Sequence, residues 1–358
     1  MTFTPAASGA VSTEVLDPTP MVQTLPADAP VTARVVAHDL DPTLFDQLYP
    51  HGTGADADGV RLVDVRRDAR GIADAEVLVT GWGSTALTPA FVRSHAPRLR
   101  LVVHTGGSVR DIFPRELYDL GLRVSAQAAT NAAPVGQFAT AVIILALKKA
   151  FLHRERYRTD RHRAVELLTD TSLGLYRRRV GVVGASQIGR LVIDNLVAMN
   201  AHVSLYDPFV GPHEAARLGV ELADDLCSLA ASVDLLSIHA PLLDSTRGMI
   251  DAGVLACLPD DAIVVNTARG AIVDEDALVA ELVTGRLSAV LDVTYPEPPR
   301  EDSPLWTLPN VFLTPHLAGA LGTEVSMLGD AAWGEVRRWM TGEPLLHELV
   351  PEVFDSRA

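Results

Sequence analysis

Residues 180–190 read Val-Gly-Val-Val-Gly-Ala-Ser-Gln-Ile-Gly-Arg, an apolar run that leads into a glycine-rich turn and then a helical pattern. The turn has the form Gly-x-Ser-x-x-Gly, from Gly184 through Ser186 to Gly189. This is the strand-to-helix fingerprint of a dinucleotide site, with serine replacing the second glycine. The first glycine permits the tight turn, the third permits close helix–strand packing, and the helix N-terminus stabilises a diphosphate. Alone it is a weak signal, because similar turns occur without a ligand.

The next predicted strand ends in a carboxylate. Asp207 lies about 20 residues after Gly184, a position from which a side chain accepts hydrogen bonds from the adenosine ribose. A carboxylate there would also repel a 2′-phosphate, and no Arg or Lys follows before Arg217. The pattern therefore favours NAD over NADP as the cofactor. The alternative is that Asp207-Pro208 forms an ordinary turn.

Short β-branched runs alternate with helical patterns on both sides of this turn. We expect strands at 31–37, 60–65, 76–80, 100–104 and 123–126, and a second series at 179–184, 202–206, 234–239, 262–266, 289–293 and 311–314. A long helix is expected to start after Asn131, with Pro134 in its first turn, and to continue into the basic stretch 154–163. Other helices are expected at 187–199, 275–284 and 323–340. Apolar strands separated by helices predict an α/β fold with two doubly wound parallel sheets.

The composition limits the classes of protein. Hydrophobic residues make up 48% of the 358 residues and charged residues 21%, which excludes a fibrous repeat and a chain disordered throughout. The 45 Asp and Glu against 30 Lys and Arg give a formal charge of −15, which argues against a general binder of nucleic acid or anionic membranes. Residues 1–30 are rich in Ala, Pro, Thr and Ser without an apolar period, so we expect a disordered extension there.

The remaining signals predict a soluble, reduced, cytoplasmic protein. The two cysteines, Cys227 and Cys257, cannot build a disulfide framework, and their spacing matches no zinc motif, so no metal is expected. The longest aliphatic run, 141–147, is far shorter than the roughly 20 residues of a membrane span. No charged start followed by an apolar run and a cleavage site opens the chain.

One basic run has two interpretations. It consists of Arg154, Arg156, Arg158, Arg161 and Arg163. It could be a nucleic-acid stripe, but acidic residues interrupt it and the whole chain is acidic. A solvated or dimer-facing helix surface is the interpretation we favour.

Candidate catalytic side chains follow the later strands. Arg269 lies in the segment N-T-A-R-G, Glu297 in P-E-P and His316 in T-P-H. Arginine can bind a carboxylate through two hydrogen bonds, and a Glu–His pair can transfer a proton. Open α/β sheets bind ligands at the carboxyl ends of their strands. Taken singly, each residue has a structural alternative: a capping or ion-paired arginine, a solvated glutamate, a core histidine.

Together with Tyr206-Asp-Pro208, His239-Ala-Pro241 and Leu291-Asp-Val293, these segments resemble the D-isomer-specific 2-hydroxyacid dehydrogenases. The likeness covers most of the chain from about residue 60 and is most specific between 180 and 320. It implies two Rossmann-like domains: a discontinuous, flavodoxin-like substrate domain (31–149 and 317–358) and an inserted NAD-binding domain (150–316). The substrate would lie in the cleft, with Arg269, Glu297 and His316 as catalytic residues. It also implies a homodimer that pairs through the cofactor domain.

The resemblance further assigns binding residues on both sides of that cleft. For the cofactor they are Gly184, Ser186, Gln187, Ile188, Gly189, Asp207, Ala240, Pro241, Thr267 and Asp292. For the substrate they are Trp82, Gly83, His104, Thr105, Gly106, Gly107 and Ser108, in two loops where glycine permits close backbone approach. Trp82 could equally be a core aromatic residue.

The sequence departs from the family pattern at several points, including Ser186, Gln187 and Gln137. Three other functions therefore remain open. The first is a non-catalytic NAD-sensing regulator on the same fold. The second is a related reaction on formate, phosphite or a phosphonate keto acid, although Glu297 argues against the formate type. The third is a methyltransferase with a similar glycine loop, which would leave Arg269, Glu297 and His316 without a role.

Overall fold

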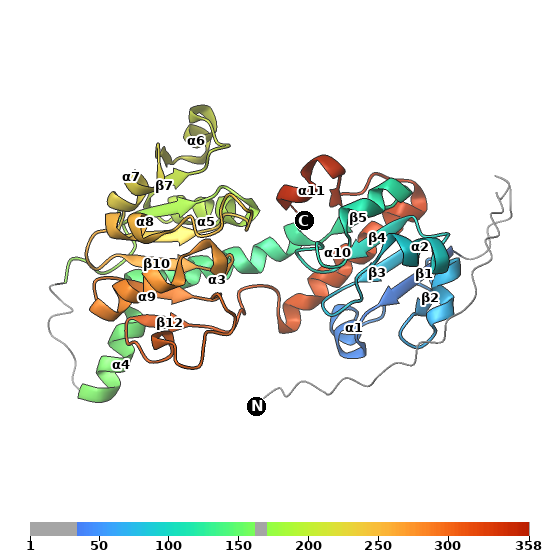
Figure 1. Cartoon of the computed structure of the whole chain (residues 1–358), viewed down its shortest axis with the longest axis horizontal. Helices are drawn as coiled ribbons and strands as arrows, with labels where there is room; N and C mark the ends of the chain where they lie inside the picture. Colours follow the sequence, from blue (N-terminus) through green and yellow to red (C-terminus); the bar gives the residue numbers. More distant parts are fainter. Residues whose placement is uncertain (1–33, 162–169, 358) are drawn as a thin grey trace. The chain divides into compact units, whose positions relative to one another are not determined.

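The computed structural model describes residues 34–161 and 170–357, in which strands and helices alternate (Figure 1). The extension predicted for residues 1–30 lies outside the described residues. The strands form two sheets, one of six strands and one of seven. The predicted α/β class is confirmed.

The first sheet has the strand order β13-β5-β4-β3-β1-β2. Its strands are β1 (Arg34–Asp39), β2 (Val60–Asp64), β3 (Val77–Thr80), β4 (Leu101–His104), β5 (Arg123–Ala126) and β13 (Glu348–Leu349). Five strands are parallel, but β13 pairs antiparallel with β5, so the prediction of a wholly parallel sheet is wrong at this edge. A two-residue strand carries no detectable periodicity. It is fixed by tertiary contacts, including the ion pair of Arg123 Nε with Glu348 Oε1 at 2.6 Å.

The second sheet is parallel throughout, in the order β12-β11-β10-β9-β6-β7-β8. Its strands are β6 (Arg179–Val183), β7 (His202–Tyr206), β8 (Glu221–Leu222), β9 (Leu235–Ile238), β10 (Ile263–Asn266), β11 (Ser288–Leu291) and β12 (Val311–Leu313). All six predicted strands of this series are present. The short, exposed β8 was not predicted.

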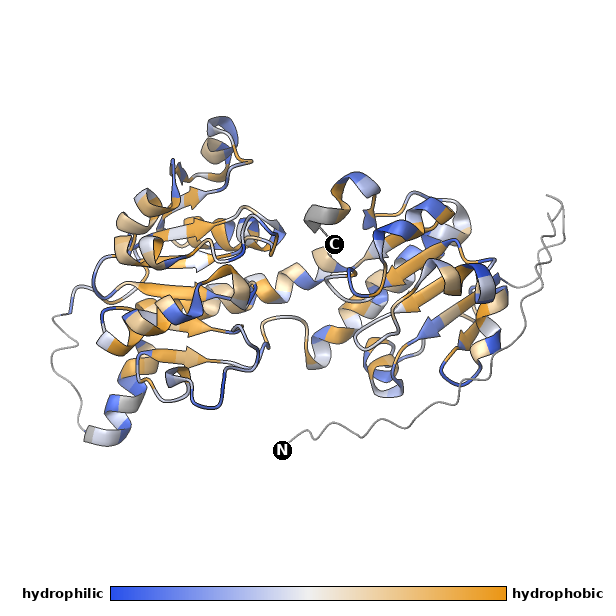
Figure 2. Cartoon of the chain, in the orientation of Figure 1, coloured by the Kyte–Doolittle hydropathy of each residue, from blue (hydrophilic) through white to orange (hydrophobic). Residues whose placement is uncertain are grey.

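Helices cover both faces of each sheet because successive strand residues point to opposite sides. In β10, Val264 packs with α7 (Leu226–Ala231), α8 (Ala252–Cys257) and α9 (Glu275–Thr284), whereas its neighbour Val265 packs with α3 (Ala128–Leu147) and α5 (Gln187–Ala198). α6 (Pro212–Leu218) completes that layer. The first sheet lies between α1 (Pro42–Leu48) with α10 (Val325–Thr341) and α2 (Pro89–His95) with α11 (Pro351–Arg357). Figure 2 shows the strands of both sheets as predominantly hydrophobic.

The long helix differs from its prediction in two ways. α3 begins at Ala128 rather than after Asn131, so Pro134 lies inside the helix instead of in its first turn. It also ends before the basic stretch, because Lys149 adopts a left-handed conformation (φ 50°) and a separate helix, α4 (Ala150–Asp160), follows. Of the predicted basic run, Arg163 lies outside the described residues. α3 is long and apolar enough to cross a membrane by composition, but more than half of it is buried in the protein, as in a core helix.

The sequence led us to expect two reduced cysteines, but in the structure they are bonded to each other. Cys227 in α7 and Cys257 at the end of α8 form a disulfide with a Cα–Cα distance of 5.5 Å. The packing of α7 beside α8 brings together two residues that are 30 positions apart, which their sequence spacing does not reveal. The expectation of a reduced pair is therefore wrong in this structure.

Candidate active site

The turn after β6 has the tight backbone, with close packing of the following helix, that its glycines predict. Gly184 adopts φ 93°, and a Cβ there would lie 2.7 Å from the amide nitrogen of Ala240. A Cβ on Gly189 would lie 2.1 Å from the carbonyl oxygen of Gly184. Both distances are far below van der Waals contact, so only glycine permits α5 to approach β6 and β9 this closely.

Ser186 is the N-cap of α5, and its Oγ accepts a hydrogen bond from Gly189 N at 3.2 Å. That interaction uses the oxygen and leaves the hydroxyl proton available. Among the described residues, no partner is found for the N–H groups of Gln187 and Ile188 at the helix start. Two free N–H groups and a free hydroxyl suit a diphosphate.

Asp207 connects the end of β7 to this turn. Its Oδ2 accepts from Ala185 N at 2.7 Å, and its Oδ1 accepts from Phe209 N at 2.8 Å. Each oxygen keeps a lone pair for a ribose hydroxyl. Arg190 was not predicted as part of the site, yet its Nε donates to Ala185 O at 2.9 Å and its Nη1 pairs with Glu214 at 2.7 Å. Arg190 directly follows the last glycine, so the sequence shows that it is next to the turn. Its contacts with Ala185 and Glu214 could not be predicted from that position.

Unpartnered polar atoms lie at the carboxyl ends of β9 and β10. The Nδ1 of His239 and the Oγ1 of Thr267 are buried and have no hydrogen-bond partner among the residues that the structure describes. Burial lowers the pKa of His239 to about 4, so its imidazole is neutral. Beyond β9, Pro241 O accepts from Thr246 Oγ1 at 2.6 Å, which holds the loop that carries Ala240. Orphaned polar atoms at this edge, beside the glycine turn, fit a bound dinucleotide.

The N-T-A-R-G segment is organised by its asparagine. Asn266 Nδ2 donates to Arg269 O at 2.9 Å, and Asn266 Oδ1 accepts from Ala268 N at 3.0 Å. Arg269 is exposed, and its only hydrogen bond among the described residues is from Nη1 to Ala268 O at 2.7 Å. The rest of its guanidinium is available to a substrate.

His316 and Glu297 are brought together as predicted. His316 Nδ1 lies 2.7 Å from Glu297 Oε1. An ionised carboxylate can only accept, so Nδ1 carries the proton and Nε2 is the free ring nitrogen. The two side chains are 48% and 42% exposed, so the pair is accessible to solvent and to a ligand. Within the described part of the chain, no hydrogen bond or ion pair joins Arg269 to either residue.

Asp292 contacts the His316 segment rather than standing free for a cofactor. Its Oδ1 accepts from Thr314 Oγ1 at 2.6 Å and from Leu317 N at 2.9 Å, and its Oδ2 accepts from Ala318 N at 2.9 Å. The carboxylate is almost fully buried. The sequence assigned Asp292 to cofactor binding, by resemblance near the nicotinamide, and did not reveal these contacts, which depend on the pairing of β12 with β11.

The two predicted substrate loops follow β3 and β4. A Cβ on Gly106 would lie 2.6 Å from His104 Nε2 and 3.2 Å from Trp82 Nε1, so the indole of Trp82 lies against the Gly106 backbone. Trp82 is 44% exposed and is not a core residue. His104 is buried, its Nδ1 lies 3.1 Å from Thr80 Oγ1, and burial lowers its pKa to about 4. His104 is therefore neutral, and the buried Thr105 Oγ1 has no hydrogen-bond partner within the described part of the chain.

Of the other members of this group, Gly107 lies beside Asn131. A Cβ on Gly107 would lie 3.5 Å from Asn131 Nδ2. Ser108 lies in the same loop after β4, and Gly83 lies in the loop after β3. Asn131 Oδ1 accepts from Ala320 N at 2.8 Å. In the sequence analysis Asn131 served only as a helix start. Its polar side chain in a mostly apolar helix was the signal that could have marked it.

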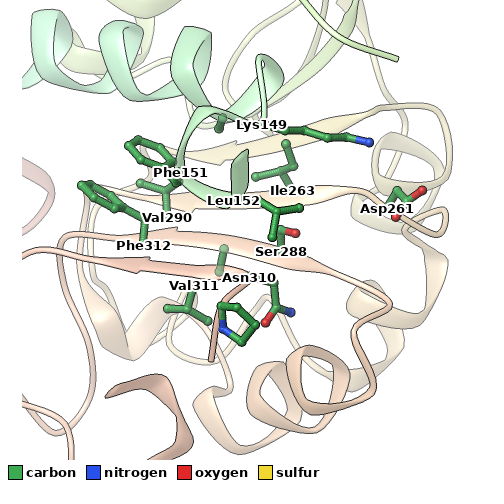
Figure 3. A pocket seen from close by; sticks show the side chains of 13 residues that line it. Lys149, Phe151, Leu152, Asp261, Ile263, Ser288, Val290, Asn310, Val311 and Phe312 are labelled. Atoms are coloured by element: carbon green, nitrogen blue, oxygen red, sulfur yellow. The ribbon is translucent and has the colours of Figure 1, made fainter. Parts of the chain in front are cut away.

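One cavity lies away from all of these residues. It is lined by α3, α4 and the first residues of β10, β11 and β12, including Ile263, Ser288 and Val311 (Figure 3). Phe151 and Phe312 stack at its wall with ring centroids 3.8 Å apart. These are the amino ends of the strands, whereas Asn266, Asp292 and His316 follow the carboxyl ends. The cavity is thus separate from the candidate active site.

Within residues 34–161 and 170–357, no group of three or more His, Cys, Asp or Glu side chains is placed to hold a metal ion.

Comparison with known proteins agrees with the geometry. Residues 140–318 match the family model for the NAD binding domain of D-isomer specific 2-hydroxyacid dehydrogenases. The D-3-phosphoglycerate dehydrogenase of Mycobacterium bovis is 31% identical over 84% of this chain and 57% of its own length. The (S)-sulfolactate dehydrogenase of Chromohalobacter salexigens is 32% identical over 62% of this chain and 72% of its own length.

A D-mandelate dehydrogenase structure from Rhodotorula graminis is similar in fold, with a TM-score of 0.73, 20% identity and coverage of 89% of this chain and 98% of the other. The chain spans about half the length of the phosphoglycerate dehydrogenases that it matches, 51% and 57% in two of them. The match to the family model, over residues 140–318, includes the glycine turn and all three candidate catalytic residues. The chain therefore belongs to the D-isomer specific 2-hydroxyacid dehydrogenase family and contains its NAD-binding domain.

Proposed function

We propose that this protein is an NAD-dependent oxidoreductase that interconverts a 2-oxo acid and a D-2-hydroxy acid. The observation that carries the proposal is the 2.7 Å contact between His316 Nδ1 and Glu297 Oε1, which leaves Nε2 free for a substrate. Neither a nucleotide sensor nor a methyltransferase needs an exposed, oriented imidazole at this edge of the sheet.

Arg269 binds and orients the substrate. Its free guanidinium N–H groups donate hydrogen bonds to the substrate carboxylate and to the carbonyl oxygen, where negative charge develops during reduction. Removing such a donor costs on the order of 100- to 1000-fold in kcat. Arg269→Ala is therefore expected to lower kcat and to raise KM for the acid.

His316 moves the proton. In reduction, its Nε2–H donates to the carbonyl oxygen as the hydroxyl forms, and in oxidation the neutral Nε2 accepts that proton. Glu297 accepts a hydrogen bond from Nδ1–H and thereby fixes the ring orientation. When NADH is bound, it supplies the hydride that the protein itself lacks.

The cofactor is held by residues whose free groups match it. Ser186, Gln187 and Ile188 would hold the diphosphate, and Asp207 would accept hydrogen bonds from the ribose hydroxyls. The position of the Asp207 carboxylate favours NAD over NADP. We also propose a homodimer, which sedimentation velocity tests by its mass.

The experiment is loss of NADH absorbance with a panel of 2-oxo acids. The panel runs from glyoxylate and hydroxypyruvate to branched, aromatic, phosphonate, phosphorylated and sulfonated acids, the last two because relatives are phosphoglycerate and sulfolactate dehydrogenases. NADPH is run in parallel. His316→Ala should lose at least 100-fold in kcat, whereas His202→Ala, an exposed histidine at the amino end of β7, should not. Bound NADH with no turnover of any acid would favour the sensor function. Formation of NADH from NAD with formate or phosphite, but no loss of NADH with any 2-oxo acid, would favour an unusual oxyanion.

A further inference from the structure

Two residues outside both substrate loops hold the first loop in place. Asp39, the last residue of β1, accepts from Arg66 Nε at 2.8 Å through Oδ1 and from Thr85 N at 2.6 Å through Oδ2. Ser84 Oγ donates to the carbonyl oxygen of Asp39. The carboxylate is only 10% exposed, so these interactions are made largely away from water.

Arg66 extends the same network to the tip of the loop. Its Nη2 donates to the carbonyl oxygen of Gly83 at 2.8 Å, while its Nη1 lies 3.8 Å from Asp41 Oδ2. Inside the loop, Ser84 Oγ accepts from Gly81 N at 2.8 Å. Segment 81–85 is thus attached to β1 and to the residues after β2 at three points, through Thr85, Ser84 and Gly83.

The attached segment carries Trp82, whose indole lies against Gly106 of the second substrate loop. No hydrogen bond of the Trp82 side chain fixes the indole there among the described residues, so its position depends on the backbone of residues 81–85. The backbone depends in turn on Asp39 and Arg66.

We propose that Asp39 and Arg66 are positioning residues that set the substrate pocket by fixing the Trp82 loop, and that Arg66 is not itself an anion-binding residue. Three of its guanidinium nitrogens face Asp39, Gly83 and Asp41, and its charge is matched by the buried carboxylate of Asp39. An arginine that recognises a substrate anion would instead present free N–H groups, as Arg269 does. The expected change in KM rests on the proposed dehydrogenase function. The expected change in the mobility of the Trp82 loop does not.

The neighbouring arginine provides a matched control. Arg67 is 77% exposed and pairs with Asp64 at 3.2 Å, three positions away on the same segment. Arg67→Met removes the same charge from the same segment without touching Asp39 or the loop. Arg66→Met removes both anchoring contacts, and Arg66→Lys keeps the charge but cannot supply two donors in the same geometry.

The test combines hydrogen exchange with kinetics. In Arg66→Met, amide exchange in a peptide covering residues 81–87 should rise at least tenfold. KM for the best 2-oxo acid should rise about tenfold, with KM for NADH within twofold of wild type. Arg66→Lys should recover part of both effects, and Arg67→Met should match wild type. Should Arg66→Met fail to fold, Asp39→Asn and Arg66→Lys provide the same two readouts.

Unchanged exchange in residues 81–87 would overturn the proposal whatever the activity. Equal increases in KM for the acid and for NADH would also overturn it, since they would indicate a general loss of structure. A wild-type protein that turns over no acid would contradict the dehydrogenase function, whereas the exchange experiment would still decide whether Asp39 and Arg66 fix the loop.

Discussion

The backbone N–H of His316 donates to the carbonyl oxygen of Asp292 at 2.9 Å, with His316 in the left-handed region at φ 52°. Non-glycine residues adopt this conformation at a cost of about 1–3 kcal/mol, so it persists only when neighbouring contacts fix it. The Asp292 carboxylate provides them by accepting from Thr314, Leu317 and Ala318 on both sides of the histidine.

Asp292→Asn should therefore lower kcat by about 10- to 100-fold, since a small misplacement of a catalytic group has an effect of that order. The amide nitrogen cannot accept, and Leu317 N and Ala318 N bond to different oxygens, so one of them loses its acceptor in either orientation. The measurement is kcat beside the Kd for NADH from fluorescence, with the highly exposed Asp260→Asn as control. A weakened Kd with kcat preserved would instead support the nicotinamide contact that the sequence suggested.

Gly189→Ala should displace α5 from β6, because the new Cβ would lie 2.1 Å from Gly184 O. Overpacking of this kind costs about 1–3 kcal/mol, so Tm should fall and the Kd for NADH should rise at least tenfold. Gly334→Ala in α10 is the control, since nothing lies within 4 Å of its added Cβ. Equal Kd values in the two variants would show that the close approach is not needed for binding.

Stability should fall as pH falls from about 6.5 to 4. His104 and His239 have pKa values of about 4 in the folded chain, against 6.5 in the unfolded one. Across that window the unfolded state binds protons that the folded state does not, so acid favours unfolding by up to about 3 kcal/mol for each histidine. The loss ends below pH 4, where both states are protonated. Urea unfolding from pH 4 to 7.5 measures the slope, and His239→Asn should make it shallower while the exposed His213→Asn should not.

The Cys227–Cys257 disulfide should resist alkylation until it is reduced. Iodoacetamide should label neither cysteine in the native protein and both after reduction and unfolding, which intact mass reports. A cross-link over 30 residues is expected to contribute roughly 3–4 kcal/mol, so dithiothreitol should lower Tm. Labelling of both thiols without reductant would contradict the bond. A stable disulfide is typical of oxidising compartments, so cell fractionation is the check on the predicted cytoplasmic location.

Most of the fold was predictable because its signals are local. Buried parallel strands appear as short apolar runs, and residues 180–190 and 263–266 were recognised on that basis. The misses depend on tertiary contacts. β13 pairs with β5 beside the Arg123–Glu348 ion pair, and α3 ends at Leu147, two residues before the left-handed Lys149, a conformation that its composition does not suggest.

In the candidate site, too, local motifs were predictable and contacts between distant segments were not. The Glu297–His316 pair was predicted from motifs and is present in the structure. The contacts of Asp292, and those that join Asp39 and Arg66 to the Trp82 loop, connect residues that no motif spacing relates. Side-chain hydrogen bonds between distant segments depend on which strands end at the same edge of the sheet. A single sequence does not reveal this arrangement.

Reduction of a 2-oxo acid with NADH deuterated at the transferred position tests hydride transfer directly. We expect a D-2-hydroxy acid with one deuterium at C2 from the wild-type protein. In His316→Asn the rate of that transfer should fall at least 100-fold, with NADH binding within twofold of wild type. An L-hydroxy acid, a product without deuterium, or an undiminished rate in His316→Asn would contradict the proposed function.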